Sequence, residues 1–457
     1  MDNKRTSPAG SPARIAAAAL AAALILAGCS TVREAREAQK DGSRLPGERV
    51  VAYAETGLPA SGAVTLAQLE EAALKASPSV LQARQAVIAA QLAVRDAKAA
   101  YLPVIDAGAG YTYTAAKPAA GAGSTHNGAW GGTASLTMLA YDFGKSRAAK
   151  RKAVTDLIAA ERGVRSAENA VLYAVRAACC ELKRDIELRE VAAETAAVYA
   201  EHLRQMRERH DVGAVNSYAV SKASVDWAQS VLSAVTASNA VHTARADLNL
   251  ALGLEDAPEL EIAGDDFRTF AGLGVEDLMA VARTNAPALA SLRASAEGAS
   301  RYVDYTVANL YPSLGLSIQY QATYDDSTLL WQLVGAGQLT QSVFCGGKKR
   351  RAIEAAVAQL RIARSQVAAE ELSLHNSLTT AVLASVRATQ QLEVAVENEK
   401  LARENFDIVS ERYQVGKASE LERSDAQVAL SSARASVVTA KYDYLDSQIL
   451  ISRLIGE

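Results

Sequence analysis

Residues 412–424 read RYQVGKASELERS, and residues 209–221 read RHDVGAVNSYAVS. The two stretches share arginine, valine, glycine and serine at the same spacing. Around them, residues 144–253 align onto 347–456 without a gap. Self-similarity in one register over this length indicates a duplicated unit. This duplication, rather than any single motif, decides how the rest of the chain is interpreted.

The duplication divides the chain into two similar halves. A second gapless block aligns residues 69–103 onto 278–312. We therefore predict repeat 1 at 65–255, a linker or equatorial segment at 256–274 and repeat 2 at 275–457.

Between the two aligned blocks the sequence changes to period-two patterning. Leucine, isoleucine and tyrosine alternate with serine, glycine and glutamine after Pro312. Such alternation predicts strands with one apolar and one polar face. We predict β-hairpins at 104–143 and 313–344, with a polar Gly/Pro-rich loop at 115–128. Apolar-out, polar-in strands of this length are typical of transmembrane barrels, and soluble periplasmic hairpins are the alternative.

Several aromatic residues of these hairpins are candidates for the membrane interface, where tryptophan and tyrosine concentrate. Ordinary packing between strands is the alternative interpretation for each of them. The candidates are Trp130, Trp331, Tyr320 and Tyr324.

The flanking sequence predicts unusually long helices. Residues 144–213 and 347–416 contain no proline, so each can form a helix of roughly 100 Å. A helix of about 39 residues returns after each glycine, and one of about 37 residues begins near Thr65. The turns at Gly213 and Gly416 then mark the end of the molecule opposite the hairpins.

The N-terminus has the features of an export signal. Basic residues precede a short apolar run that ends in Leu26-Ala27-Gly28-Cys29, which resembles a lipobox. We predict a signal peptide at 1–28, lipidation of Cys29, and a lipid-anchored linker at 29–64. Ser30 in place of aspartate indicates sorting to the outer membrane. An ordinary signal peptide with a chance cysteine is the alternative.

Composition argues against several classes of function. The formal net charge is -3 and no basic block occurs, so nucleic-acid binding is not expected. No nucleophile, phosphate loop or metal-ligand spacing was found, so we expect no catalytic residue, metal or cofactor. Cys179, Cys180 and Cys345 are interpreted as buried small apolar residues.

Three motifs resemble the TolC-type outer-membrane factor family over residues 65–457. They are Tyr311-Pro312, Phe344-Cys345-Gly346-Gly347 with Arg350, and RYQVGKAS at 412–419 continued by Glu420-Leu421-Glu422 and Asp425-Ala426-Gln427. The resemblance implies a mainly α fold with membrane β-structure. It implies a homotrimeric twelve-stranded β-barrel in outer-membrane lipid, continued into a long α-helical periplasmic barrel. Expected partners are a periplasmic adaptor and an inner-membrane transporter of the ABC or RND type.

The resemblance also implies an aperture at the tip. Glu422 and Asp425 lie three residues apart, hence on one helix face, and would form acidic rings in a trimer. A solvated helix face is the alternative. Tyr413 matches one member of the family's closing clasp, and Lys222 occupies the first-repeat position equivalent to Asp425. The clasp's aspartate and arginine are replaced by Ala219 and Ala418, so that ion pair cannot form.

These observations predict an outer-membrane exit duct rather than an enzyme. Its cargo would be small molecules in efflux, or a protein such as a toxin in type I secretion. A non-conducting periplasmic coiled-coil lipoprotein is the alternative.

Overall fold

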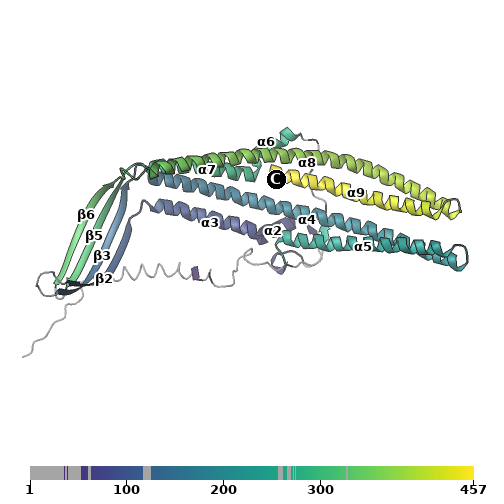
Figure 1. Cartoon of the computed structure of the whole chain (residues 1–457), viewed down its shortest axis with the longest axis horizontal. Helices are drawn as coiled ribbons and strands as arrows, with labels where there is room; N and C mark the ends of the chain where they lie inside the picture. The colour runs from purple at the N-terminus through teal and green to yellow at the C-terminus, as the bar shows by residue number, and fades with distance from the viewer. Residues whose placement is uncertain are drawn as a thin grey trace, which may run out of the picture.

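The computed structural model describes residues 35–36, 39, 53–59, 63–116, 125–255, 261–264, 269–270, 272, 274–325 and 328–456. The predicted signal peptide at 1–28 and the predicted lipidation site Cys29 lie outside these ranges. The part described is long and narrow, with a β-sheet at one end and two helix turns at the other (Figure 1).

Three pairs of helices with matching lengths make up most of the structure. The longest pair has 67 residues per helix, the next 36 and the third 22. They are α4 (Lys145–Asp211) with α8 (Lys348–Gln414), α5 (Ser217–Leu252) with α9 (Glu420–Ile455), and α3 (Pro78–Ala99) with α7 (Pro287–Ala308). At 1.5 Å per residue, α4 and α8 each extend about 100 Å, as the sequence predicted.

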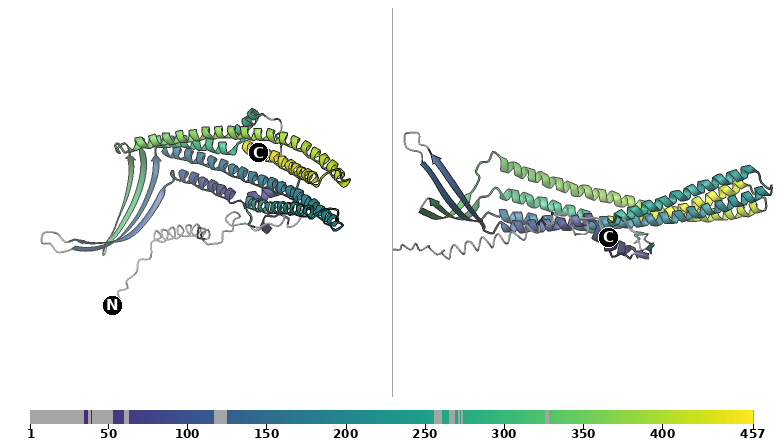
Figure 2. Two further views of the ribbon diagram at one scale, coloured as in Figure 1. Left: turned by 45° about the vertical axis from the view of Figure 1, so that its right-hand side comes forward. Right: turned by 90° about the horizontal axis from the view of Figure 1, so that it is seen from below.

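The helices form one curved layer, four helices wide (Figure 2). Beside the sheet the order across the layer is α3, α4, α7, α8; toward the tip it is α5, α4, α9, α8. The short helices therefore follow one another end to end alongside the long ones. Helix α4 lies inside the layer along its whole length and contacts both halves of the chain.

The prediction of one continuous helix before Pro103 is wrong, because the helix is broken at Pro78. Helix α2 (Leu66–Ala76) ends there and α3 begins. Proline has no backbone N–H and disfavours helical geometry at the residue before it, and Ser77 accordingly has φ -65° and ψ 123°. The second half breaks in the same way between α6 (Val275–Asn285) and α7, at Pro287.

The sheet contains the four segments with alternating sequence. Its order is β2-β3-β5-β6, and every neighbouring pair is antiparallel. The strands are β2 (Val104–Ala116), β3 (Thr125–Tyr141), β5 (Ser313–Asp325) and β6 (Thr328–Thr340). The predicted loop at 115–128 was too long, because both strands continue into it. Backbone pairing extends beyond the apolar residues that revealed the strands.

A second, smaller sheet was not predicted. Strand β1 (Ala63–Thr65) pairs in parallel with β4 (Glu261–Ala263), so the start of the first half is tied to the segment between the halves. A 3-10 helix, η1 (Tyr53–Glu55), precedes β1.

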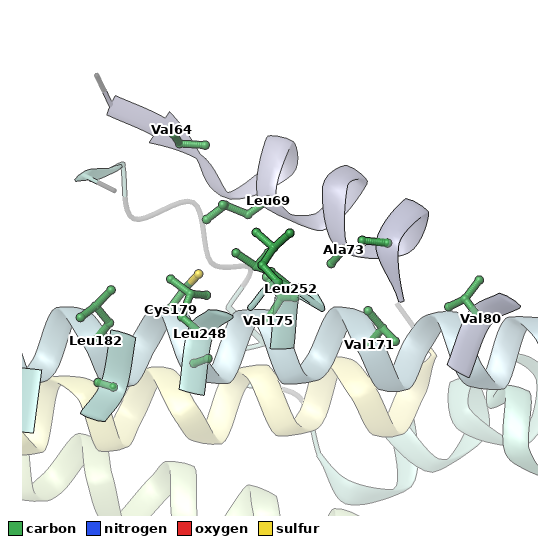
Figure 3. Packing of buried hydrophobic residues seen from close by; sticks show 14 of the residues in the cluster. Val64, Leu69, Ala73, Val80, Val171, Val175, Cys179, Leu182, Leu248 and Leu252 are labelled. Atoms are coloured by element: carbon green, nitrogen blue, oxygen red, sulfur yellow. The ribbon is translucent and has the colours of Figure 1, made fainter. Parts of the chain in front are cut away.

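Apolar side chains concentrate near the middle of the layer. Leu69 and Ala73 of α2 pack on Val175 and Cys179 of α4, and Leu252 at the end of α5 joins them (Figure 3). A matching cluster surrounds Leu278, Leu289, Leu378 and Ile451 in the second half. The core therefore lies where the short helices meet end to end.

The cysteine prediction holds for two residues of three. Cys179 and Cys180 are buried, and burial raises the pKa of the Cys179 thiol to about 12. Cys345 is exposed, so its predicted burial is wrong. It lies in the turn between β6 and α8. None of the described helices is both long and apolar enough to cross a bilayer.

Candidate functional site

The tip of the molecule is built from two similar turns. Gly213 and Gly416 have φ of 76° and 73°, a left-handed conformation that glycine adopts without a steric penalty. The N–H of Gly213 donates to the carbonyl of His210, and that of Gly416 to the carbonyl of Tyr413. Each turn thus ends a long helix and starts the return helix, as the sequence predicted.

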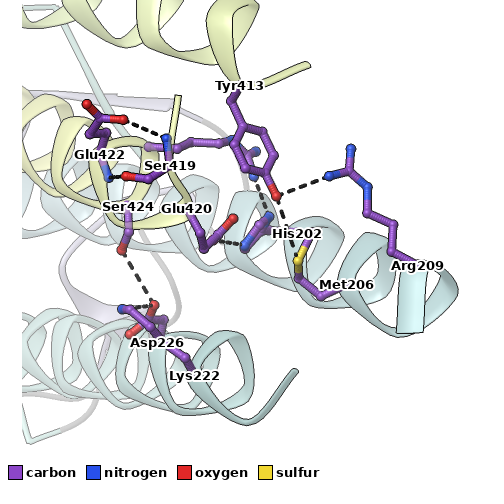
Figure 4. Close-up of polar contacts among 11 residues, drawn as sticks. His202, Met206, Arg209, Lys222, Asp226, Tyr413, Ser419, Glu420, Glu422 and Ser424 are labelled. Atoms are coloured by element: carbon purple, nitrogen blue, oxygen red, sulfur yellow. Dashed lines mark hydrogen bonds and ion pairs between the residues drawn. The ribbon is translucent and has the colours of Figure 1, made fainter. Parts of the chain in front are cut away.

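Tyr413 joins the last turn of α8 to α4. Its hydroxyl lies 3.2 Å from Nη1 of Arg209 and 3.8 Å from Sδ of Met206 (Figure 4). The guanidinium groups of Arg209 and Arg423 each lie 5.3 Å from the ring centroid, within cation–π range. Burial, together with the neighbouring Glu420 carboxylate, raises the pKa of Tyr413 to about 12. The side chain is therefore neutral at ordinary pH.

His202 of α4 lies between two side chains of α9 (Figure 4). Its Nε2 faces Oε1 of Glu420, and its Nδ1 faces Nη1 of Arg423. Burial alone would raise the pKa of Glu420, but hydrogen bonding to His202 and Tyr413 outweighs it and holds this pKa below its usual value. These contacts connect the first half of the chain to the second.

Lys222 belongs to a separate group on α5. Its Nζ lies 3.0 Å from Oδ2 of Asp226, and Oγ of Ser424 lies 3.5 Å from the same oxygen. The hydrogen bond to Asp226 raises the pKa of Lys222. This residue, predicted at the aperture because it is equivalent to Asp425, is thus paired with a carboxylate of its own helix.

Glu422 takes part in a capping box at the start of α9. Its carboxylate accepts a 2.5 Å hydrogen bond from the N–H of Ser419, and the Ser419 hydroxyl accepts one of 3.2 Å from the N–H of Glu422. These hydrogen bonds, first of all the one from the backbone, lower the pKa of Glu422. The Ser-x-x-Glu spacing is typical of a capping box, and the sequence predictions did not include it.

Asp425 lies one turn further along α9 and is exposed. Within the described residues its carboxylate has no hydrogen-bond or salt-bridge partner. The acidic ring predicted for Glu422 and Asp425 requires the same carboxylates from further copies of the chain.

The four interfacial aromatic candidates lie on one face of the sheet. Trp130 pairs with Tyr324 across β3 and β5, and Tyr320 neighbours Trp331, with 6.3 Å between ring centroids. All four side chains are exposed. Leu136, Met138, Leu316, Ile318 and Leu333 share this face through the same register, while Thr133, Ser135, Ser317, Gln319 and Gln321 lie on the other.

The contacts of His202 with Glu420 and Arg423, which connect the two halves at the tip, were not predicted from the sequence. No role at the tip was assigned from the sequence to His202 or Arg423, and Glu420 entered only as part of the motif after Gly416. No spacing along the chain reveals these contacts, because the partners are separated by more than two hundred residues. Within the described residues, no three histidine, cysteine, aspartate or glutamate side chains are grouped to hold a metal ion.

The arrangement of two long-helix units joined to a four-stranded sheet has counterparts among known proteins. The sequence model of the family described as "Outer membrane efflux protein" matches residues 69–254 and 278–457. The chain belongs to this family. The resemblance to TolC-type factors is therefore confirmed.

Relatives of the outer membrane efflux protein family resemble the chain over most of its length. Outer membrane protein TolC of Salmonella enteritidis is 24% identical over 428 residues, which cover 88% of this chain and 84% of that protein. Membership of the family places the chain among outer-membrane efflux channels, which are not enzymes.

Solved structures of outer-membrane channels share the fold. VceC of Vibrio cholerae matches with a TM-score of 0.73 and 21% identity, covering 86% of this chain and 96% of that one. CmeC of Campylobacter jejuni matches with a TM-score of 0.75 and 18% identity, covering 86% and 85%. CusC matches with a TM-score of 0.75 and 14% identity, covering 91% and 98%.

Proposed function

We propose that three copies of this chain form the exit duct of a tripartite exporter in the outer membrane. Each chain would contribute four strands to a twelve-stranded barrel and a four-helix-wide layer to a periplasmic tunnel. The chain would be a tandem duplication, with repeats at 65–255 and 275–457. The matching helix lengths of the two halves support this proposal.

The observation that carries the proposal is the sheet with one apolar face and two open edges. Within the described residues, β2 and β6 each pair on one side only. Unpaired backbone groups cannot be left in the hydrocarbon of a bilayer, so a lone sheet of this kind cannot span it. Strands from further copies, added edge to edge, would close the barrel and leave the polar face around a lumen.

The helical layer has a similar requirement for partners. Helix α8 forms one edge of the layer and exposes large apolar side chains, among them Leu372, which is 74% exposed. Further members of this row are Ile362, Leu383, Val386, Val394, Leu401 and Ile408. A row of this length along one helix indicates a surface that another chain covers. The same three-fold assembly that closes the sheet would cover it.

The remaining sequence predictions become parts of this proposal. Lipidated Cys29 would anchor the chain in the outer membrane through the linker at 29–64. The turns at Gly213 and Gly416 would contact a periplasmic adaptor. Rings of Glu422 and Asp425 would surround the aperture, where the exposed carboxylates favour hydrated cations.

The proposed inner-membrane partner is an ABC or RND-type transporter, and the proposed cargo is correspondingly a secreted protein or small molecules. Deleting the gene and measuring both drug sensitivity and the protein content of the culture medium separates these cargo classes. Purifying the tagged chain after cross-linking identifies the transporter.

The proposal is tested by adding purified protein to planar bilayers. We expect trimers that dissociate on heating and ion conductance across the bilayer. Ile318→Lys, on the apolar face, should prevent insertion, because a lysine facing lipid costs about 2–4 kcal/mol at the membrane centre. Ser317→Lys, its neighbour on the polar face, is the matched control and should still insert.

Protein that is monomeric, or trimeric without conductance, would contradict the proposal. It would instead support the alternative of a coiled-coil spacer. Equal insertion of the two lysine variants would show that the apolar face does not contact lipid.

A further inference from the structure

The environment of His202 differs from that of three other histidines whose side chains the structure describes. His202 is 4% exposed, whereas the side chains of His210, His242 and His375 are exposed. Both ring nitrogens face charged side chains of α9, which belongs to the other half of the chain. A buried imidazole is thus placed between the first and second helix pairs at the tip.

The partners of the ring determine where its proton lies. A guanidinium group donates hydrogen bonds and cannot accept them, so the Nδ1 that faces Arg423 must be the acceptor. The proton then resides on Nε2, which faces the Oε1 of Glu420. In this neutral form Nδ1 accepts from Arg423, and the N–H of Nε2 faces the Glu420 carboxylate.

Several other charged or titratable groups face this site. Helix α9 contributes Glu420 and Arg423, α8 contributes Tyr413, and α4 itself contributes Arg209; these are the partners described above. On α5, Lys222 lies close enough to Glu420 to interact with it electrostatically.

Cations outnumber anions around the ring. Asp226, the second carboxylate near this group, is already bound by Lys222 and Ser424. Tyr413 carries no charge at ordinary pH. Among these groups Glu420 is therefore the one carboxylate that is not paired with Lys222, and the guanidinium groups of Arg423 and Arg209 lie near it.

We propose that His202 is a proton-sensitive latch that holds the α8–α9 pair against α4, and that acid on the tip side loosens it. The inference rests on the proposed duct, because the tip is then its periplasmic mouth. A second proton from solvent binds Nδ1 and removes the acceptor for Arg423. The resulting N–H and the guanidinium are two like-charged donors facing each other, so the contact of His202 with Arg423 breaks. Only the contact of Nε2 with Glu420 then joins α4 to α9 at this ring.

The test uses the full-length trimer in planar bilayers, with the tip side changed from about pH 7.5 to about pH 5.5, the range in which histidine changes charge. Open probability of the unmodified protein should rise about tenfold, which corresponds to about 1.4 kcal/mol. His202→Gln has no titrating ring and should remove this response. His210→Gln, on the same helix but exposed, is the matched control and should retain it.

A second measurement follows the latch without relying on conductance. Spin labels at Arg207→Cys and Leu421→Cys, both exposed and on α4 and α9, report the separation of the two helices once Cys345→Ser has removed the exposed thiol. Labelled chains are diluted into unlabelled trimers so that distances within one chain dominate. A longer distance should appear at about pH 5.5 and be absent in His202→Gln.

The two measurements separate failure of the latch from failure of the duct. Absence of conductance from every protein at both pH values contradicts the duct, and the spin-label distances then decide the latch alone. Distances that do not change with pH, or that change equally in His202→Gln, overturn the latch. Conductance that is independent of pH overturns its role in opening.

Discussion

The two halves of the chain have nearly the same backbone but different side chains at the tip. Both long helices end in a left-handed glycine, and both return helices have 36 residues. Yet Ser217 stands where the second half has Glu420, and Val220 where it has Arg423. His210 likewise stands in the place of Tyr413. The two halves therefore have equivalent backbones at the tip, and the residues that differ between them make the contacts from one half to the other.

The largest difference between the halves is expected at the glycines that end the return helices. A Cβ at Gly456 would lie 2.6 Å from the carbonyl oxygen of Asn285, whereas one at Gly253 would lie 3.4 Å from that of Ala76. Both glycines are left-handed. Gly456→Ala should lower the free energy of unfolding by about 3 kcal/mol, and Gly253→Ala by about 1 kcal/mol. Thermal unfolding followed by circular dichroism measures both, and equal losses would contradict the expected asymmetry.

Removing the carboxylate of the cross-half contact should have the next largest effect. Glu420→Ala leaves His202 and Arg423 without their anionic partner in a buried site. We expect a loss of about 2 kcal/mol in the stability of the tip. Ser217→Ala, the equivalent exposed position, should change it by less than about 0.5 kcal/mol. Hydrogen exchange at the first turn of α9 measures the loss, and similar effects at both positions would show that the contact is not stabilising.

The helix caps should behave alike in the two halves. The Asn216 side chain accepts a 3.1 Å hydrogen bond from the N–H of Ala219, as Ser419 does from Glu422. Asn216→Ala and Ser419→Ala should each lower the stability of the helix that they cap by about 1 kcal/mol. Hydrogen exchange in the first turns of α5 and α9 provides the measurement. A much larger effect at Ser419 would assign the capping box a role beyond capping.

The smallest expected effect is on the stability of the folded protein at acidic pH. The pKa of Glu420 is lower at the folded tip than in an unfolded chain, so its ionised form stabilises the folded state. That contribution is complete above about pH 4.3 and is lost as pH falls through the lower folded-state value. The melting temperatures of the unmodified protein and Glu420→Gln should therefore converge in this acidic range. A constant difference down to about pH 2 would show that the charge of Glu420 does not contribute.

Periodicity along the chain predicted the repeated helices and strands because each is determined by local sequence. The absence of proline predicted the long helices α4 and α8, and the alternation of apolar and polar residues predicted strand β5. Pro78 was available as a signal for the break between α2 and α3, and it was not used. By contrast, the β1–β4 pair and the contacts of His202 depend on residues far apart in sequence. The local sequence around these residues contains no signal for the contacts, which form only when the chain has folded.

The matched lengths of α4 and α8 restrict how the chain can change over evolutionary time. One extra residue in a helix turns everything beyond it by about 100° and moves it about 1.5 Å. Such an insertion in α4 alone would rotate His202 away from Glu420 and shift α4 against the five helices that contact it, α2, α3, α5, α7 and α9. Insertions and deletions should therefore be rare in these helices, and helix length should vary in both halves together or not at all.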